Sequence, residues 1–210
     1  MSVDGVVFDF DGLLADTETA WAVAEGALFV RRGRPFGEEH REIFIGMAVA
    51  DAAQYMAGLF SEPAPLIEDE LRAEAARQLR RHAPPMPGAV ELIRALQGRK
   101  PVAIASNTPR DLLDLALASS GIGELIGVTV AGDEVPEPKP RPDVYLRACE
   151  LIGVRPHRAV AIEDSATGAA AARAAGLHVV VVPSLPGTIS DFDALHASLA
   201  DPELTSWLVG

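Results

Sequence analysis

The chain is poor in cysteine and in aromatic residues, and it has no long uncharged apolar run. Cys149 is the only cysteine among 210 residues, so an internal disulfide bond cannot form. Only 5% of the residues are aromatic although 49% are hydrophobic, which favours helices packed on a sheet over a β-sandwich. No window reaches the roughly 18 apolar residues that suggest a membrane span, and residues 1–9 lack the basic start of a signal peptide. We therefore expect a cytoplasmic protein with no membrane partner.

Positive charge is also scarce. Lys and Arg number 18 against 30 Asp and Glu, which gives a formal net charge of −12, and the only two lysines are Lys100 and Lys139. An acidic surface repels the phosphate backbone of nucleic acids, so we expect no nucleic-acid partner. A small phosphorylated metabolite is compatible with this charge, because local positive charge inside a cleft can outweigh the overall field. Nothing in the sequence demands more than a monomer.

Short apolar runs alternate with segments of helical spacing from about residue 87 onward, and a first apolar run stands alone near the N-terminus. The apolar runs cover residues 5–9, 102–106, 128–131, 159–163 and 179–182. The helical segments between them cover residues 109–121, 142–153 and 166–176. Fully apolar strands separated by helices are typical of a parallel sheet with helices on both faces. We predict a doubly wound, Rossmann-like α/β core built from residues 1–15 and 86–210.

The intervening residues 16–85 have a different pattern. Helical spacing recurs in residues 18–33, 38–45, 49–60 and 64–83, with no convincing strand between them. A cluster of prolines with Gly88 ends this region sharply. We predict an inserted α-helical domain over residues 16–85. Such an insertion would stand above the C-terminal ends of the strands, where open sheets bind ligands.

Two carboxylates follow the first predicted strand, in the motif Asp9-Phe10-Asp11-Gly12. Carboxylates held this close raise each other's pKa values unless a cation lies between them, and Mg²⁺ is a hard cation that prefers oxygen ligands. A carboxylate beside a bound metal can attack phosphorus, and its neighbour can protonate the leaving oxygen. The simpler alternative is an acidic turn whose aspartates cap backbone amides.

Side chains suited to binding phosphate occur at two later positions. Ser106 and Asn107 lie between a strand and a helix, where a hydroxyl and an amide can bind phosphoryl oxygens beside the helix N-terminus. Lys139 lies among three prolines that restrict its direction, and its charge could neutralise a phosphate or the nearby nucleophile. Each position has a plain alternative, an ordinary helix cap for the first pair and a solvated loop residue for Lys139.

A second carboxylate pair, Glu163 and Asp164, ends the run 159–163. If this strand neighbours the first, the pair meets Asp9 and Asp11 at one edge of the sheet and forms a metal site of oxygen ligands. Asp164 could also be the N-cap of the next helix. Caps explain each polar cluster singly, but they do not explain why two carboxylate pairs, a hydroxyl-amide pair and a lysine should converge on one end of one sheet.

In this order the motifs Asp-x-Asp-Gly, Ser-Asn-Thr, Lys-Pro and Glu-Asp-Ser-x-x-Gly resemble those of the haloacid dehalogenase-like hydrolase superfamily. The helical insertion resembles the cap of its β-phosphoglucomutase-like branch. The resemblance implies that Asp9 is the nucleophile and Asp11 the general acid and base. It implies Mg²⁺ bound by Asp9, the Asp11 carbonyl and Asp164, with Glu163 beside that shell or in it. The residues implied for binding the phosphoryl group are Ser106, Asn107 and Lys139.

These features favour a phosphomonoester hydrolase over a sugar phosphomutase. The mutase branch usually has a histidine shortly after the first motif and a basic residue near the Gly-x-x turn of the cap, and residues 19–21 and 45–49 contain neither. Glu18 and Trp21 lie where a cap could touch the substrate, so we name them as candidate specificity residues, with plain cap core as the alternative for Trp21. A signalling module with a phosphorylated aspartate is a third hypothesis, which the cap disfavours because a lid serves to enclose a substrate.

Overall fold

A computed structural model describes residues 3–81, 83–183 and 189–210. Its centre is a six-stranded sheet in which every pair of neighbouring strands is parallel. The strands are β1 (Gly5–Phe8), β2 (Val102–Ala105), β3 (Thr129–Val130), β4 (Ala159–Glu163), β5 (His178–Val181) and β6 (Ala194–Leu195). Their order across the sheet is β3-β2-β1-β4-β5-β6. The parallel α/β core predicted from the alternation of apolar runs and helices is confirmed.

The register of the central strands decides where the polar motifs meet. Phe8, at the end of β1, is aligned with Ile104 of β2 on one side and with Ile162 of β4 on the other. The residues that follow these three positions therefore leave the sheet at the same edge. Because β1 and β4 are neighbours, the two carboxylate pairs of the sequence arrive side by side, as the metal-site hypothesis requires.

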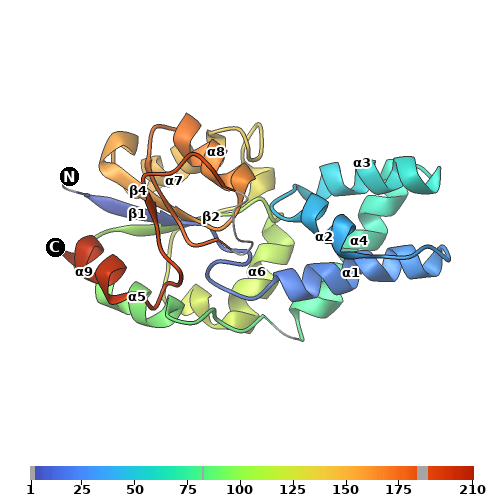
Figure 1. Cartoon of the computed structure of the whole chain (residues 1–210), viewed down its shortest axis with the longest axis horizontal. Coiled ribbons are helices and arrows are strands. Elements are labelled where there is room, and N and C mark those ends of the chain that lie inside the picture. The colour runs from blue at the N-terminus through green and yellow to red at the C-terminus, as the bar shows by residue number, and fades with distance from the viewer. Residues whose placement is uncertain (1–2, 82, 184–188) are drawn as a thin grey trace.

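Helices cover both faces of the sheet, because alternate side chains of a strand point to opposite sides. The covering helices are α5 (Ala89–Leu96), α6 (Arg110–Ser120), α7 (Asp143–Leu151), α8 (Ala166–Ala174) and α9 (Pro202–Val209). Val6 and Phe8 pack in one apolar cluster with α5, α6 and α9, and Val7 packs in another with α7 and α8. Figure 1 shows these two layers on opposite sides of the strands. In the described part of the chain, no helix is both long and apolar enough to cross a membrane.

Between β1 and α5 the chain forms four helices, which we call the helical unit. They are α1 (Glu18–Arg31), α2 (Glu38–Phe44), α3 (Val49–Phe60) and α4 (Ala64–Leu79). The unit lies beyond the end of the sheet toward which β1 runs (Figure 1). Its two connections to the sheet run side by side: the Asp16 amide donates to the Pro84 carbonyl at 2.8 Å, and the Met86 amide donates to the Leu14 carbonyl at 2.9 Å. The chain thus enters and leaves the unit at one place.

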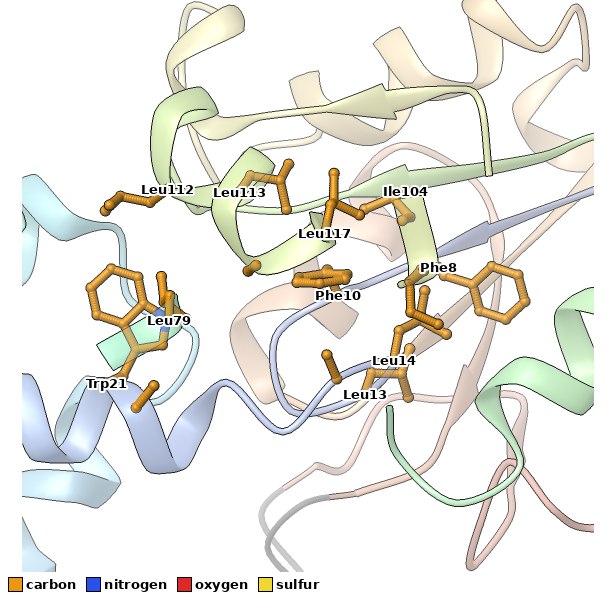
Figure 2. Close-up of a cluster of buried hydrophobic side chains, with 14 of the residues drawn as sticks. Phe8, Phe10, Leu13, Leu14, Trp21, Leu79, Ile104, Leu112, Leu113 and Leu117 are labelled. Carbon is orange, nitrogen blue, oxygen red and sulfur yellow. The ribbon is translucent and has the colours of Figure 1, made fainter. Parts of the chain in front are cut away.

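One apolar cluster runs from the sheet into the helical unit. Phe8, Phe10 and Leu14 are fully buried next to α6, and Trp21 and Leu79 belong to the same cluster at its other end (Figure 2). The interior of the unit continues this cluster through Leu28, Phe29, Met56, Ile67 and Leu71. Since burial of apolar surface is the main stabilising contribution in folding, this continuous packing holds the unit against the sheet.

The structure departs from the predicted elements in a few places. The sequence reading missed the eight-residue helix α5 and the two-residue strand β6. The strand predicted over 128–131 is shortened to Thr129–Val130, and the helix predicted over 64–83 ends at Leu79, with residue 82 outside the described residues. The prolines at 84 and 85 exclude a helix that continues through residue 83, because the residue before a proline avoids helical backbone angles, but they do not by themselves set the end at Leu79.

Candidate active site

A small cavity lies between the C-terminal edge of the sheet and the helical unit. From the sheet side it is lined by Asp9, Asp11, Asn107, Thr108, Lys139, Asp164 and Ser165. From the helical unit it is lined by Glu18, Trp21, Glu25, Phe44, Gly46, Met47, Val49, Ala52 and Leu71. It holds about 40 Å³, which is room for water but not for a phosphate ester with its leaving group. Of the site residues predicted from sequence, Ser106 and Glu163 are fully buried behind this cavity, and the other seven line it.

Asp9 follows β1 and lies at the floor of the cavity, with only 6% of its surface exposed. Its amide donates to the Ile162 carbonyl of β4 at 2.9 Å, which fixes the backbone at the point where β1 ends. The Lys139 ammonium lies 2.6 Å from Oδ1 of Asp9 and 2.6 Å from Oε1 of Glu163. The lysine therefore bridges two carboxylates from neighbouring strands.

Both carboxylate oxygens of Glu163 accept hydrogen bonds from neighbouring residues. Oε1 accepts hydrogen bonds from Lys139 and, at 2.5 Å, from the Tyr145 hydroxyl of α7. Oε2 accepts from the backbone amide of Asp164 at 3.1 Å and from the amide and hydroxyl of Ser165 at 3.4 and 3.1 Å. A methyl group on Gly168 would overlap the Glu163 carboxylate, so only glycine at this position leaves room for it. These donors occupy both oxygens of Glu163.

Asp11 accepts four hydrogen bonds. Oδ2 accepts from the hydroxyls of Ser106 at 2.7 Å and Thr108 at 2.9 Å. Oδ1 accepts from the Thr17 hydroxyl at 2.8 Å and from the Trp21 indole Nε1 at 3.3 Å. Ser106 and Thr108 belong to the sheet side, whereas Trp21 belongs to the helical unit. The position of Asp11 is thus set jointly by the two parts of the chain.

Asn107 ties the Lys139 loop to the helical unit. Its amide nitrogen donates to the Gly46 carbonyl at 3.1 Å and to the Lys139 carbonyl at 3.2 Å, and its oxygen accepts from the Lys139 amide at 2.7 Å. In this closed arrangement the polar groups of Asn107 and Ser106 already have protein partners. Their contact with a phosphoryl group stays a prediction.

Negative charge accumulates at the floor of the cavity. Carboxylate oxygens of Asp9, Glu163 and Asp164 all lie within 4.8 Å of one another. Burial raises the pKa of Asp9 well above its ordinary value; Lys139 opposes this rise, and the three nearby carboxylates add to it. Burial lowers the pKa of Lys139, but Asp9 and Glu163 outweigh burial and raise it, so the ammonium stays charged.

The chemistry of this donor set fits a hard divalent cation. Three carboxylates supply oxygen ligands only, which is the ligand type that Mg²⁺ prefers. Gly12 leaves the space beside them open: its φ is +78°, and a Cβ there would lie 2.6 Å from Oδ2 of Asp164. Any other residue would therefore meet both backbone strain and a collision with Asp164.

The helical unit contributes a stripe of α1 to the cavity. Glu18, Trp21 and Glu25 follow one another at helical spacing and all line the cavity. Burial raises the pKa of Glu18 to about 8, and the charges of Asp11, Glu25 and Asp9 act in the same direction. Burial likewise raises the pKa of Glu25 to about 8, opposed only by the charge of Arg41. Both carboxyl groups are therefore largely protonated at neutral pH.

A family model described as haloacid dehalogenase-like hydrolase matches residues 3–176. This match covers most of the chain. The protein belongs to the haloacid dehalogenase-like hydrolase family. The membership inferred from the four motifs is confirmed, and the chain is an enzyme of this family of hydrolases.

Relatives of this hydrolase include curated proteins and solved structures. The protein CbbY of Rhodobacter capsulatus is 36% identical over 214 residues, which cover 96% of this chain and 94% of CbbY. Validoxylamine A 7'-phosphate phosphatase of Streptomyces hygroscopicus subsp. limoneus is 32% identical over 176 residues, which cover 83% of each chain. The crystal structure of a CbbY variant from Rhodobacter sphaeroides in complex with xylulose-(1,5)bisphosphate is similar with a TM-score of 0.80 at 28% identity, covering 95% of this chain and 96% of that chain.

Five polar residues of this hydrolase site, Ser165 among them, were not singled out from sequence as site residues. Thr108 and Thr17 stood inside recognised motifs, and their contact with Asp11 could have been suspected from their hydroxyl groups. Glu25 follows Trp21 by four residues, so helical spacing places it on the same face of α1. Tyr145 carried no signal, because its bond to Glu163 depends on how α7 packs on the sheet.

Proposed function

We propose that this hydrolase is a Mg²⁺-dependent phosphomonoester hydrolase that acts on a small phosphorylated metabolite through an aspartyl-phosphate intermediate. The observation that carries the proposal is the position of Asp9: its carboxylate lies at the floor of the cavity, 2.6 Å from a charged lysine and among three further carboxylates. The name of the validoxylamine phosphatase relative supports phosphatase chemistry. We further propose a cytoplasmic monomer without a nucleic-acid or membrane partner, in line with the net charge of −12.

We propose that residues 1–15 and 86–210 form the catalytic core and residues 16–85 a cap. The side-by-side connections at 14–16 and 84–86 support this division, because they would let the helical unit move as one body. The small volume of the cavity supports it too, since a substrate with its leaving group would fit only when the unit moves away from the sheet. Closing then excludes bulk solvent and leaves room for the one water that the second step uses.

Mg²⁺ would be held by Asp9, Asp164 and the backbone carbonyl of Asp11. Glu163 belongs to the same acidic cluster, but its oxygens are occupied by protein donors. It would therefore act beside the metal, by fixing Lys139 and balancing charge. When bound, the cation would offset negative charge on the carboxylates and on the transferring phosphoryl group.

The residues divide the reaction into two steps. In the first, an oxygen of Asp9 forms a bond to phosphorus while the bond to the leaving alcohol breaks, and Asp11 gives its proton to that alcohol oxygen. In the second, Asp11 takes a proton from water, the water oxygen bonds to phosphorus, and the bond to Asp9 breaks, releasing orthophosphate. Lys139, Ser106 and Asn107 would bind the phosphoryl oxygens, and Lys139 would offset their charge.

The test is orthophosphate release from p-nitrophenyl phosphate with Mg²⁺. Asp9→Asn should abolish turnover while circular dichroism shows an intact fold. Asp16→Asn is the matched control, because the Asp16 side chain accepts hydrogen bonds only from Thr19 among the described residues. This control should keep most of the activity. Full activity of the Asp9 variant would refute the proposal.

The same preparation separates the two alternatives. A sugar phosphomutase would interconvert hexose phosphate isomers with little release of orthophosphate. A signalling module would keep a long-lived phosphoaspartate without turnover. We expect orthophosphate release to exceed isomer interconversion, because the cavity offers no histidine from the start of α1 and no basic residue from residues 45–49.

A further inference from the structure

Two glutamates of α1 face the cavity from the side opposite Asp9. Glu18 and Glu25 are seven residues apart, about two helical turns, so they lie on one face of α1, and both line the cavity. Glu25 is only 6% exposed, and among the described residues no side chain or amide forms a hydrogen bond or ion pair with its carboxyl group. Because its carboxyl oxygens reach the open space of the cavity, a ligand there can bind them without displacing a protein partner.

Glu74 shows that the helical unit can satisfy a buried glutamate. It is 5% exposed, and Arg31, Arg77 and Gln78 all bind its carboxylate. Glu25 is buried to the same extent but faces the cavity instead of such partners. The difference marks Glu25 as a group oriented toward a ligand.

Among the described residues, no cation of the helical unit lines the cavity beside the two glutamates. Their neighbours in the cavity wall include the apolar side chains of Phe44, Met47 and Leu71. Among the described residues that line the cavity, Lys139 is the only cation, and it already pairs with two carboxylates. The charge of Arg41 opposes the rise in the pKa values of both glutamates, but Arg41 does not line the cavity, and its side chain is 44% exposed and pairs with Glu38 at 3.5 Å.

We propose that the cavity selects phosphate monoesters whose leaving group carries hydroxyl or ammonium groups and no second anionic group, and that Glu25 is the selecting residue. This inference rests on the proposed function and narrows its substrate. A protonated carboxyl group donates to a hydroxyl, and an ionised one pairs with an ammonium. A second phosphate or a carboxylate would lie between Glu18 and Glu25 without a free cation to offset its charge. The pKa values near 8 keep both forms of each glutamate accessible near neutral pH.

The experiment compares leaving groups that share one carbon chain. The series consists of glucitol 6-phosphate, 1-amino-1-deoxyglucitol 6-phosphate, gluconate 6-phosphate and glucitol 1,6-bisphosphate, with the corresponding three-carbon compounds in parallel. For the wild-type enzyme we expect kcat/KM for the hydroxyl or ammonium member to exceed that for both anionic members at least about tenfold. The ratio between the first two members tells whether a hydroxyl or an ammonium is preferred.

Two substitutions test the role of Glu25 itself. At pH 9, where Glu25 is largely ionised, Glu25→Gln, which keeps the shape, should lower the discrimination against gluconate 6-phosphate at least about fivefold, and Glu25→Lys should reverse it. Glu42→Lys is the matched control for Glu25→Lys, because Glu42 is an exposed residue of the same helical unit and both substitutions change the net charge by the same amount. It should leave the discrimination as in the wild type. Unfolding curves check that each variant is folded.

Several outcomes would overturn the inference. One is a wild-type preference for an anionic member, and another is discrimination unchanged by Glu25→Gln. Turnover of every member no faster than that of p-nitrophenyl phosphate would also overturn it, because the cavity would then select nothing. If no substrate released orthophosphate, p-nitrophenyl phosphate included, the proposed function would fail together with the inference.

Discussion

Two buried glutamates of the helical unit should respond to replacement by glutamine in opposite ways. Burial raises the pKa of Glu25 to about 8 from its ordinary 4.5. Burial also raises the pKa of Glu74, but the hydrogen bond from Gln78 and the charges of Arg77 and Arg31 outweigh it and leave the pKa below its ordinary value. Glu25→Gln should therefore stabilise the protein at pH 8, and Glu74→Gln should destabilise it.

The size of the first effect follows from proton linkage. Between pH 4.5 and 8 the folded protein holds a proton on Glu25 that the unfolded chain has lost, so the free energy of unfolding falls as the pH rises. These two pKa values differ by about 3.5. One pKa unit corresponds to about 1.4 kcal/mol, so the free energy of unfolding falls by about 5 kcal/mol over this range. Opening of the helical unit would rehydrate the carboxyl group, so this value is an upper bound. We expect a measured gain of about 2 to 5 kcal/mol for Glu25→Gln at pH 8.

The assay is urea unfolding of the wild type and both variants at several pH values from 5 to 8, without metal. At pH 5 Glu25→Gln should differ little from the wild type, and its advantage should grow toward pH 8. Glu74→Gln should be less stable than the wild type above pH 5, because the contribution of an ionised, paired Glu74 is present above the unfolded pKa. Opposite trends in two variants of the same helical unit exclude a general effect of removing one negative charge.

A flat difference between Glu25→Gln and the wild type over this range would refute the reasoning. It would mean that Glu25 ionises in the folded protein as easily as in the unfolded chain. The carboxyl group would then be hydrated or paired, and the account of an unpartnered glutamate facing the cavity would fail with it.

Three further substitutions test the arrangement of the site. Lys139→Met should lower kcat by about two to three orders of magnitude, and Mg²⁺ should stabilise this variant more than it stabilises the wild type, because among the described residues no other cation pairs with Asp9 or Glu163. Equal stabilisation, measured by unfolding with and without Mg²⁺, would count against this role. Trp21→Phe removes the indole donor to Asp11 but keeps an apolar ring. We expect kcat/KM to fall about tenfold and the pH profile of kcat/KM to shift. An unchanged pH profile would mean that Trp21 acts only as a residue of the apolar core. Gly168→Ala should displace the Glu163 carboxylate and destabilise the protein by about 1 to 3 kcal/mol in thermal unfolding, and a neutral effect would contradict the close packing found here.

The core was predictable because its strands are short, fully apolar and separated by helices. Such runs, when separated by helices, are typical of strands buried on both faces, as in a parallel sheet. The polar motifs were predictable for the same reason, since each follows a strand and parallel strands end at one edge. The helix α5, with eight residues, and the strand β6, with two, were not predicted, because segments this short show too little hydrophobic periodicity.

What the sequence could not show is how the side chains of the site are shared between the two parts of the chain. Trp21 illustrates this: it is both a core residue at 9% exposure and a donor to Asp11, and its contact with a substrate stays a prediction. The partner of Glu163 on α7, Tyr145, depends on the packing of a helix on the sheet. The isolation of Glu25 depends on which residues surround the cavity, and a linear pattern does not record that.

The central claim is that Asp9 carries the phosphoryl group between substrate and water, and a rapid acid quench tests it most directly. Enzyme with Mg²⁺ is mixed with excess p-nitrophenyl phosphate, quenched, digested and examined by mass spectrometry. We expect the mass of one phosphoryl group on the Asp9 peptide, with more of it in Asp11→Asn, which lacks the base for the second step, and none in Asp9→Asn. A phosphoryl group on another residue, or steady turnover by Asp9→Asn with no phosphorylated peptide, would contradict the account.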